Sequence, residues 1–453
     1  MSLINIRKFM INWRKPTIFV LLYLSGSKIP RNLRIIQKLV KSSKREIRKY
    51  QEEKFKKLLF HAYKNVPYYQ RVLKESGVIT KSGKVDLKKF SNIPILTKDI
   101  IREEGKNLYS KDYKRRGYYK NTSGGSTGEP VEFIQDKKYS DWNDATKIFY
   151  FNSLGHDWGD PEIKLWGSDR DIIKGNLSLK DRATNYLYNR RFFNCYNFSK
   201  NNMISLLLLH NSYRPVGYWS YMEAMSEFAD FIVENNLKVF SPKYIVSTIG
   251  PLEENVRKKI SQAFSCSVFD QYGSREMGFI AAEFPENEGK LSFPWFNYVE
   301  NTNGLVKNVI VTNLVNFSMP LIRYDIGDAA IVNNGNIKRL CGRTLGFFYK
   351  KDGSLIHTHF LVQTLFFVEW IKRFQIIQPN FRSIEIKVEK KENVLISPRS
   401  QREILQKVKK LIGDEVECKI KFVKRIHPQK NGKYAYTICK IPKENLKKLR
   451  EQK

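Results

Sequence analysis

A run of nine residues combines hydroxyl side chains with glycines, a composition that suits anion binding. Glycine allows positive φ angles and a close approach of the backbone, so neighbouring N–H groups and hydroxyls can converge on phosphate oxygens. A polar turn between two strands explains the same composition without a ligand. The run consists of Thr122, Ser123, Gly124, Gly125, Ser126, Thr127, Gly128, Glu129 and Pro130.

The flanks of this loop predict two strands. Gly117-Tyr118-Tyr119-Lys120 and Val131-Glu132-Phe133-Ile134 are rich in aromatic or β-branched residues, and the second run alternates. A Walker A loop instead leads into a helix and carries Gly-Lys-Ser/Thr, whereas Glu129 follows Gly128 here. We therefore expect the loop to connect strands.

Four later segments, the first three expected to be loops and the last a turn, carry charged residues beside glycine or tyrosine, and they have to be weighed together with this loop. Taken singly, each has an ordinary explanation. Asp328 and Arg343 could form a surface ion pair, Glu276 could cap a helix, and Lys433 could be one of many solvated lysines. The segments are Tyr272-Gly273-Ser274-Arg275-Glu276, Arg323-Tyr324-Asp325-Ile326-Gly327-Asp328, Gly342-Arg343 and Asn431-Gly432-Lys433.

The elements that would position these segments alternate between strand and helix. Such alternation predicts a parallel sheet with helices on both faces, and ligands then bind beyond the carboxyl ends of the strands. The segment that starts at Tyr272 follows the last of these strands. The expected strands are Glu162–Gly167, Tyr244–Thr248 and Cys266–Gln271, and the expected helices are Met222–Asn235 and Leu252–Phe264.

Earlier in the chain, Lys41–Ser76 shows helical spacing that Pro67 interrupts, Thr97 is a candidate N-cap, and helical spacing returns over Ser140–Leu154. Between Val306 and Val332, short apolar runs predict a more irregular, partly antiparallel sheet. The composition changes after Gly342-Arg343-Thr344, and the tail predicts a small domain. Its expected elements are strands Ile384–Glu389, Val394–Ser397, Val416–Val423 and Tyr434–Lys440, and helix Gln401–Ile412.

We therefore expect an α/β protein with three parts. Residues 1–60 form a basic helical N-terminal extension. Residues 61–343 form a large domain with doubly wound sheets and an irregular β subdomain. Residues 344–453 form a small, mobile α+β C-terminal domain.

The composition supports a globular chain and does not point to nucleic acid. The 453 residues carry 80 Lys and Arg against 45 Asp and Glu, a net charge of +35, but the basic residues are spread over the whole length. We expect no specific nucleic-acid partner. The five cysteines are far apart and never spaced as Cys-x-x-Cys, so reduced thiols in a cytoplasmic protein are expected. His357 and His359 alone predict no metal site.

The N-terminal segment has two interpretations. Met1–Lys15 is basic, and the apolar run Pro16–Leu24 after it is too short to span a bilayer and lacks a clear cleavage pattern, so no signal peptide is expected. A buried helix or strand is the simpler expectation. Peripheral contact with the inner face of an anionic membrane is the alternative.

Taken in order, these segments resemble those of the adenylate-forming superfamily of acyl-CoA synthetases, adenylation domains and luciferases. The likeness is greatest to the phenylacetate-CoA ligase and capsule-biosynthesis branch, and it extends over most of residues 60–440. It also includes His61-Ala62-Tyr63, Val66-Pro67-Tyr68-Tyr69 and Ile93-Pro94-Ile95-Leu96-Thr97-Lys98.

The resemblance implies that a carboxylate attacks the α-phosphate of ATP, giving an acyl-adenylate and pyrophosphate. It implies that the hydroxyls of Thr122, Ser123, Ser126 and Thr127, with the amides of Gly124, Gly125 and Gly128, hold the β- and γ-phosphates. Further implied roles are Mg²⁺ binding by Glu276, adenine stacking by Tyr272 beside Gly273, ribose binding by Asp328, and ribose or phosphate binding by Arg343.

The resemblance implies that Lys433, on the small domain, brings its ammonium between the carboxylate and the α-phosphate. It then withdraws, so that a second nucleophile can enter. The sequence departs from the family at Arg275, where Thr or Ser is usual, and in the segment after Arg343, which lacks the usual acidic residue. Glu283–Pro285 and Leu291–Phe293 lack the cysteines and histidines of the zinc site that many relatives in this branch carry, so no zinc is expected.

Three functions remain open. The first is an ATP- and Mg²⁺-dependent ligase that transfers an activated small-molecule carboxylate to an amine or thiol, in capsular or surface polysaccharide biosynthesis. The second is an acyl- or aryl-CoA ligase, with coenzyme A as acceptor. The third is a non-enzymatic protein that binds nucleic acid or membrane and is indifferent to ATP.

Overall fold

The computed structural model divides into two compact units, which we describe separately. Unit 1 comprises residues 1–326 and 330–340, and unit 2 comprises residues 327–329 and 341–453. The structure describes residues 12–80, 82–123, 131–166, 179–195, 200–249, 252–303, 307–343, 347–349, 355–358, 361, 364–365, 368–391, 394, 396–413, 415–426 and 436–442.

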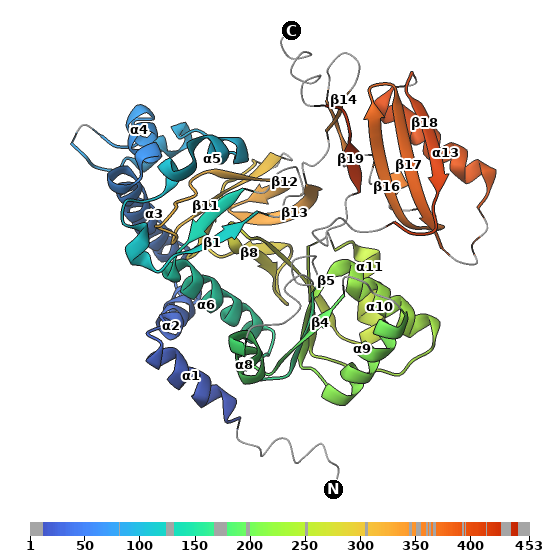
Figure 1. Cartoon of the computed structure of the whole chain (residues 1–453), viewed down its shortest axis with the longest axis horizontal. Helices are drawn as coiled ribbons and strands as arrows, with labels where there is room; N and C mark the ends of the chain where they lie inside the picture. Colours follow the sequence, from blue (N-terminus) through green and yellow to red (C-terminus); the bar gives the residue numbers. More distant parts are fainter. Residues whose placement is uncertain are drawn as a thin grey trace. The chain divides into compact units, whose positions relative to one another are not determined.

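Unit 1 is built around an eleven-stranded sheet of order β10-β11-β12-β13-β9-β8-β7-β6-β5-β3-β4 (Figure 1). Strands β4, β3, β5, β6 and β7 pair in parallel, whereas β7, β8 and β9 pair antiparallel. The mixed α/β architecture confirms the expected fold class. The strands are β3 Glu162–Trp166, β4 Arg190–Asn194, β5 Gly217–Tyr221, β6 Tyr244–Thr248, β7 Ser267–Ser274, β8 Gly278–Glu283, β9 Lys290–Ser292, β10 Asn297–Val299, β11 Lys307–Asn313, β12 Tyr324–Asn333 and β13 Asn336–Arg343.

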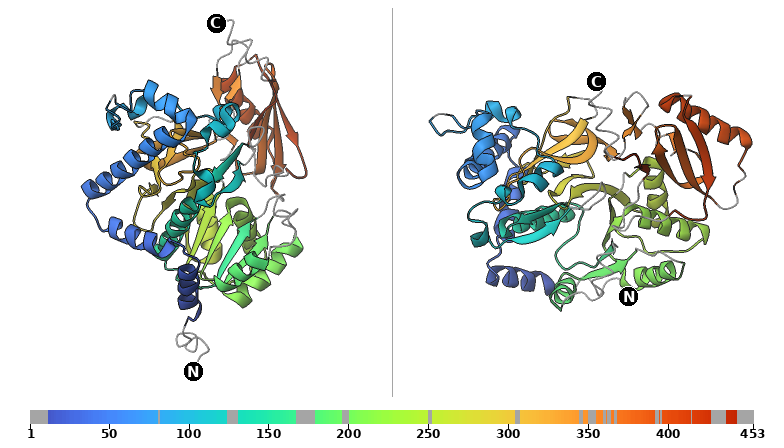
Figure 2. Two further views of the ribbon diagram at one scale, coloured as in Figure 1. Left: turned by 60° about the vertical axis from the view of Figure 1, so that its left-hand side comes forward. Right: turned by 45° about the horizontal axis from the view of Figure 1, so that its top comes forward.

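Helices cover both faces of the parallel strands, as a doubly wound sheet requires. On β5, Tyr218 packs in one core cluster with residues of α10 and α11, while its neighbour Trp219 packs in the other with Tyr150 and Phe151 of α6. Figures 1 and 2 show α9, α10 and α11 together on one side of these strands. The helices of unit 1 are α1 Arg14–Leu24, α2 Ile29–Val40, α3 Lys44–Asn65, α4 Pro67–Glu75, α5 Lys98–Glu104, α6 Lys137–Ser153, α8 Leu179–Leu187, α9 Lys200–Tyr213, α10 Met222–Glu234 and α11 Glu254–Phe264, with 3₁₀ turns at Leu87–Asn92, Gly105–Leu108 and Tyr113–Arg116.

Local sequence signals place several of these helices. Thr97 caps α5 by accepting a hydrogen bond from the Ile100 amide, as its residue type and position predict. Pro67 interrupts the helical stretch Lys41–Ser76, as predicted, because α3 ends before Val66 and Pro67 begins α4.

The first three helices pack into the main core of unit 1. Ile18 of α1, Leu33 of α2 and Leu58 of α3 belong to the same hydrophobic cluster as the sheet. The expectation of a buried helix over Pro16–Leu24 is wrong for most of that run, because only Ile18 of α1 is buried and Leu24 is 73% exposed. Among the described residues, no helix is long and apolar enough to cross a membrane.

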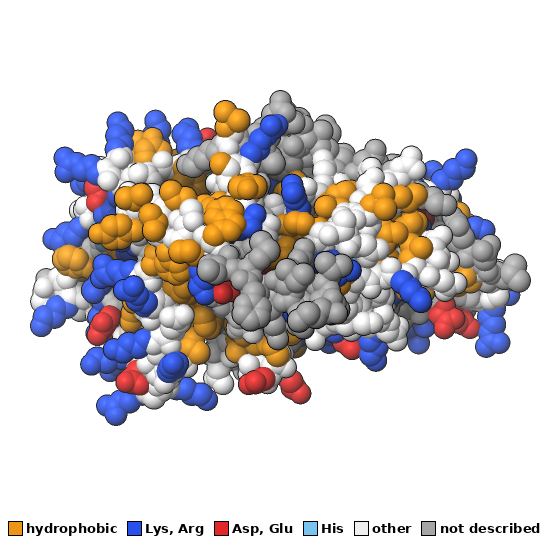
Figure 3. Space-filling view, turned by 90° about the horizontal axis from the view of Figure 1, so that it is seen from below, with side chains coloured by type: hydrophobic (Ala, Val, Ile, Leu, Met, Phe, Trp, Pro, Cys, Tyr) orange, Lys and Arg blue, Asp and Glu red, His pale blue; other side chains and the backbone are white. Residues whose placement is uncertain are grey.

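Basic side chains are widely distributed over the surface. Figure 3 shows Lys and Arg around much of the visible face and no single dominant cluster of them. On this face the basic residues are therefore spread out, as they are along the sequence.

Three segments that were expected to be loops lie largely in strands. Tyr272–Ser274 ends β7, Tyr324–Asp328 opens β12, and Gly342-Arg343 ends β13. Their glycines and charged residues resemble loop composition, but each segment continues a strand whose earlier or later residues are apolar. The polar residues therefore stand on or at the end of the sheet.

Unit 2 contains a four-stranded sheet of order β18-β17-β16-β19 with α13 packed against it. The strand expected over Val394–Ser397 is wrong, since the described residues there are irregular. Strand β16 was missed, because a register shift between Ile371 and Arg373 breaks its alternation. The elements are β14 Phe347–Tyr349, β15 Leu355–His357, β16 Ile371–Asn380, β17 Ser383–Lys390, α13 Pro398–Ile412, β18 Glu417–Phe422 and β19 Thr437–Cys439.

A buried ion network fastens β7 to β8 and β9. The ammonium of Lys290 lies 2.7 Å from a carboxylate oxygen of Asp270, and Arg257 donates two hydrogen bonds to Glu283, at 2.9 and 3.0 Å. Burial raises the pKa of Asp270, and the charge of Lys290 opposes that rise. Asp270 and Lys290 are 3% and 8% exposed, so neither charge is compensated by water.

We expect Lys290→Met to lower the free energy of unfolding by about 3–5 kcal/mol, because it leaves the Asp270 carboxylate buried without its cation. Lys290→Met/Asp270→Asn should recover part of this loss. The deficit of the single variant should shrink as pH falls, because protonation of a carboxyl with a raised pKa in the folded state favours folding. Urea unfolding followed by tryptophan fluorescence tests this, since every tryptophan except Trp370 belongs to unit 1. Equal stability of single and double variants would contradict the role of the pair.

Candidate active site

The turn between β7 and β8 carries Glu276. Its side chain is 8% exposed and accepts a hydrogen bond from the hydroxyl of Tyr324, at 3.3 Å, on β12. The hydroxyl of Ser274 accepts from the Met277 amide and closes the turn. Glu276 thus presents a nearly buried carboxylate just beyond the end of β7, in the turn to the antiparallel strand β8.

Two glycines make this turn possible. Gly278 has a φ of +66°, and a Cβ there would lie 2.5 Å from the side-chain oxygen of Asn143 and 2.7 Å from the hydroxyl of Tyr139. At Gly273, a Cβ would lie 2.4 Å from the backbone oxygen of Gly278. The strand ends that flank Glu276 therefore approach each other more closely than any other residue type allows.

The hairpin that flanks the Ser/Thr/Gly loop is tied to the same turn. Strands β1 Tyr119–Thr122 and β2 Glu132–Gln135 pair antiparallel, as the flanking sequences predict. The side-chain amide of Gln135 donates to the backbone oxygens of Arg275, at 2.9 Å, and Glu276, at 3.2 Å. Gln135 therefore fixes one end of the hairpin on the turn that bears Glu276.

The other end of the hairpin leads to the loop. Thr122 pairs with Glu132, three residues along β1 from the pair of Tyr119 with Gln135. At about 3.3 Å per residue, Thr122 lies roughly 10 Å along the strand from the level of the Glu276 turn. The separation between Thr122 and the Glu276 turn is compatible with an extended polyanion such as a nucleoside triphosphate.

Ser123 closes the base of the loop. It is 1% exposed, its hydroxyl accepts from the Val131 amide at 2.9 Å, and its own amide donates to the Val131 backbone oxygen. These contacts favour a structural role for Ser123. The rest of the predicted phosphate loop, Gly124 to Gly128 with Ser126 and Thr127, lies outside the described residues.

Strand β12 carries the predicted ribose-binding residue. Asp328 is 8% exposed and follows Tyr324 by four residues, so the alternation of the strand places both side chains on one face. Tyr272, predicted to stack on adenine, is 6% exposed within β7. Arg343 ends β13, but its side chain and the whole of Lys433 lie outside the described part of the chain.

The residues before β12 are held by parts of the sequence whose role was not predicted. Tyr69 accepts a hydrogen bond from the Ile322 amide, and Asp136 accepts from the amides of Phe317 and Ser318. His61 contacts the Phe317 backbone oxygen through Nε2, and burial lowers its pKa, which favours the neutral ring. These side chains position the segment that leads to Tyr324.

Aromatic residues gather at the carboxyl ends of the parallel strands. The ring of Trp166, at the end of β3, lies 4.6 Å from that of Tyr221, at the end of β5, and 5.3 Å from that of Trp219. At the end of β6, the Thr248 hydroxyl donates to Gln271 at 3.0 Å. The ends of Glu162–Gly167 and Tyr244–Thr248 were predicted near a ligand, whereas β5 was missed despite its aromatic run.

The arrangement suits a divalent cation that is shared with phosphate. Within the described residues, no group of three or more His, Cys, Asp or Glu side chains could form a complete metal cage. Mg²⁺ bound to a nucleotide needs only one or two protein carboxylates, with phosphate oxygens and waters completing the octahedron. The nearly buried carboxylate of Glu276 fits this requirement.

Comparisons with known proteins agree with this fold. The family described as the CapK C-terminal domain matches residues 348–440. The chain is 23% identical to Protein CapK of Staphylococcus aureus over 408 residues, which covers 86% of this chain and 89% of CapK.

Solved structures of ligases share the architecture. The structure of 2-hydroxyisobutyryl-CoA ligase in the postadenylation state, in complex with R3-HIB-AMP, matches with a TM-score of 0.64 and 17% identity over 88% of this chain and 90% of that one. The anthranilate CoA ligase AuaEII in complex with anthranoyl-AMP matches with a TM-score of 0.51 and 15% identity, over 74% of this chain and 66% of the ligase. The chain therefore has the fold of these ligases, and its similarity to Protein CapK agrees with the likeness expected to a capsule-biosynthesis branch.

We expect Gly278→Ala to disrupt the turn that carries Glu276. The added methyl would collide with Asn143 and Tyr139, whereas at Gly335, which also has a positive φ of +74°, the nearest atom to a Cβ is 3.6 Å away. Gly335→Ala should therefore cost only the backbone strain of about 1–2 kcal/mol, and Gly278→Ala should cost more. Urea unfolding of both variants tests this, and equal losses would show that close packing around Gly278 is unimportant.

Proposed function

We propose that this protein is an ATP-dependent, adenylate-forming ligase that activates a small-molecule carboxylate. The observation that carries the proposal is the attachment of the hydroxyl- and glycine-rich hairpin to the Glu276 turn through Gln135. It joins a candidate phosphate loop to a candidate Mg²⁺ ligand within the fold of adenylate-forming ligases. The ligases compared above were solved with acyl-adenylates, which are the intermediates this chemistry requires.

In the proposed first step, a carboxylate oxygen of the substrate attacks the α-phosphorus of ATP. A bond forms between that oxygen and phosphorus, the bond to the bridging oxygen of the β-phosphate breaks, and pyrophosphate leaves. Hydroxyls of Thr122, Ser126 and Thr127, with the amides of Gly124, Gly125 and Gly128, hold the departing phosphates. Ser123 instead closes the base of the loop, because its hydroxyl accepts a hydrogen bond from the Val131 amide.

The remaining residues orient the nucleotide in this proposal. Asp328 accepts from the ribose hydroxyls, Tyr272 with Gly273 borders the adenine, and Arg343 reaches ribose or phosphate oxygens. Glu276 would hold Mg²⁺, and the bound ion would neutralise phosphate charge. The hydrogen bond from Tyr324 keeps the Glu276 carboxylate in position.

Lys433 supplies the cation at the reacting centre. Its ammonium lies between the substrate carboxylate and the α-phosphate, where two negative charges would otherwise repel each other. Because Lys433 belongs to unit 2, a movement of that unit would withdraw it and admit the second nucleophile. An amine would then give an amide, and a thiol would give a thioester.

The pathway and the acceptor are further parts of the proposal. Similarity to CapK supports a role in capsular or surface polysaccharide biosynthesis, with an amino acid or uronic acid as the activated group. The compared CoA ligases, together with the aromatic wall of Trp166 and Tyr221, favour a second candidate function, acyl- or aryl-CoA ligation. We place the reaction in the cytoplasm, where ATP is available.

We expect the purified protein to catalyse exchange of labelled pyrophosphate into ATP when its carboxylate is present. A panel of amino acids, uronic acids, and aliphatic and aromatic acids should give exchange with one class. Adding coenzyme A or an amine and identifying thioester or amide by mass spectrometry then separates the two ligase functions. Absence of exchange with every class would contradict adenylation.

We expect Lys433→Ala to lower the rate of adenylation by about 10²–10³-fold, because it removes the cation that stabilises the developing charge. ATP affinity should change little, since other residues hold the nucleotide. Lys424→Ala is the matched control, because Lys424 is an exposed lysine in the same unit. Wild-type exchange in Lys433→Ala would remove this lysine from the mechanism.

A further inference from the structure

A basic cavity of about 390 Å³ lies between α2, α3 and α6 of unit 1, and none of the residues assigned to the nucleotide lines it. Its volume falls within the range of about 300–1,000 Å³ that is typical of small-molecule sites. We call it the α2–α6 cavity. The lining residues that matter to its chemistry are Lys28, Arg31, Asn32, Lys54, Lys137 and Lys138.

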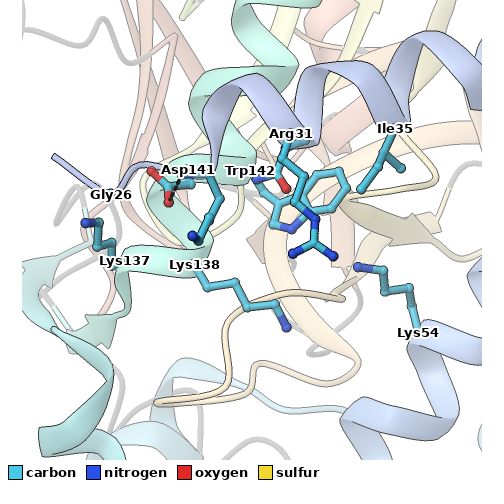
Figure 4. A pocket seen from close by; sticks show the side chains of 10 residues that line it. Gly26, Arg31, Ile35, Lys54, Lys137, Lys138, Asp141 and Trp142 are labelled. Atoms are coloured by element: carbon cyan, nitrogen blue, oxygen red, sulfur yellow. Dashed lines mark hydrogen bonds between the residues drawn. The ribbon is translucent and has the colours of Figure 1, made fainter. Parts of the chain in front are cut away.

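Cations from three helices meet in this cavity. In Figure 4 the charged ends of Arg31 of α2, Lys54 of α3 and Lys138 of α6 point toward one another. Like charges at such a place repel, and water screens the repulsion only in part, because Arg31 and Lys138 are exposed but Lys54 is half-buried. The protein must therefore offset an unfavourable concentration of positive charge here.

Carboxylates of the protein offset it only in part. Asp141 is the acidic residue of the lining, and its two oxygens already accept from the Ser27 hydroxyl and the Lys28 amide, each at 2.9 Å. Across the described ranges, no carboxylate oxygen comes within 4.0 Å of the charged nitrogens of Lys28, Arg31, Lys54, Lys137 or Lys138. The negative charges of Asp141 and of nearby Asp136, which opposes the lowering of the Lys138 pKa, therefore compensate the cations of the cavity only in part.

Two of the ammonium groups are partly withdrawn from water. Lys54 lies 4.6 Å from the ring centroid of Trp142. Lys138 is exposed as a residue, but its ammonium lies 3.7 Å from the ring centroid of Phe317. Burial, reinforced by neighbouring cations, lowers the pKa of Lys54 to about 8. Burial of the ammonium also lowers the pKa of Lys138 to about 8, although the negative charge of Asp136 opposes this.

A buried donor without a partner also lines the cavity. Asn32 is 5% exposed, and its side-chain NH₂ group has no hydrogen-bond partner among the described residues. Such a group costs free energy unless a ligand or water satisfies it. Lys28, Arg31, Asn32 and Ile35 recur at helical spacing, so α2 turns one face to the cavity.

We propose that the α2–α6 cavity binds a phosphate group or a similar multivalent oxyanion. Arg31, Lys54 and Lys138 surround the anion, and the buried Asn32 lies beside them in the lining. Nothing in this proposal depends on adenylation.

Two kinds of molecule could bring this phosphate. One is a free phosphorylated metabolite or inorganic phosphate. The other is a lipid headgroup, because α1 ends just before the cavity and exposes Tyr23 and Leu24, which are 83% and 73% exposed. The shared chemistry is the oxyanion, and the experiment separates its sources.

The test uses the full chain and measures how fast individual lysines react with a limiting amine-acylating reagent, by peptide mass spectrometry. Buffers at equal ionic strength contain chloride, inorganic phosphate or inorganic pyrophosphate. At a phosphate or pyrophosphate concentration about ten times the dissociation constant, mass action should slow acylation of Lys54 and Lys138 about tenfold. Lys88 and Lys258, which lie outside the cavity, should react at unchanged rates.

Arg31→Gln should weaken this protection, whereas Arg34→Gln should leave it intact. Both arginines are exposed on α2, but only Arg31 lines the cavity. Vesicles of phosphatidylcholine with phosphatidic acid, compared with phosphatidylcholine alone, provide the second arm. Protection by the acidic vesicles assigns a lipid headgroup, and protection by phosphate or pyrophosphate alone assigns a free ligand. Absence of protection by all of these probes, or equal protection in Arg31→Gln and wild type, would overturn the proposal.

Discussion

The candidate active site depends on two hydrogen bonds from a single side chain. Gln135, at the end of β2, donates to the backbone oxygens of Arg275 and Glu276, and Asn121 in turn donates to the Gln135 oxygen at 3.2 Å. Gln135 is 1% exposed, so these bonds have no competition from water, and losing them would leave buried carbonyl groups unsatisfied. One amide thereby couples a hairpin to a turn that lies 140 residues later in the chain. Without it, the hydroxyl-rich loop and the Glu276 carboxylate would be positioned independently.

Strand β7 imposes the second constraint, because it belongs to two kinds of sheet at once. It pairs in parallel with β6 up to Asp270 and then antiparallel with β8 from Gln271 onward. The buried pair of Asp270 with Lys290 lies where this change occurs, and the close approach of Gly273 to Gly278 follows it. The parallel part supplies strand ends where ligands bind, and the antiparallel part returns the chain sharply enough to place Glu276 beside Tyr324. The position of the site therefore follows from the change from parallel to antiparallel pairing along β7. A shift of the turn would disturb both the parallel and the antiparallel part of the sheet.

The sequence predicted what local physics determines. Strand Tyr244–Thr248 has the expected bounds, and Thr97 caps its helix, because apolar runs and capping residues act over a few positions. The opening of β12 was taken for a loop because Asp325, Gly327 and Asp328 are turn-forming residues. The contacts of Gln135 could not be inferred at all, since nothing local indicates which distant backbone it meets. The exposure of α1 was likewise hidden, because an apolar run alone does not say which face finds a partner.

The composition of the sequence could not reveal the α2–α6 cavity either, because it does not show which charges meet in space. Its cations come from separate helices, and in the sequence they are ordinary members of a population of 80 basic residues. Only the fold shows that Arg31, Lys54 and Lys138 point toward one another while Asp141 is already engaged. An isolated surface lysine is stabilised by water, but lysines held over aromatic rings and beside other cations lose part of that hydration. An oxyanion held among these cations would balance their charge within the cavity.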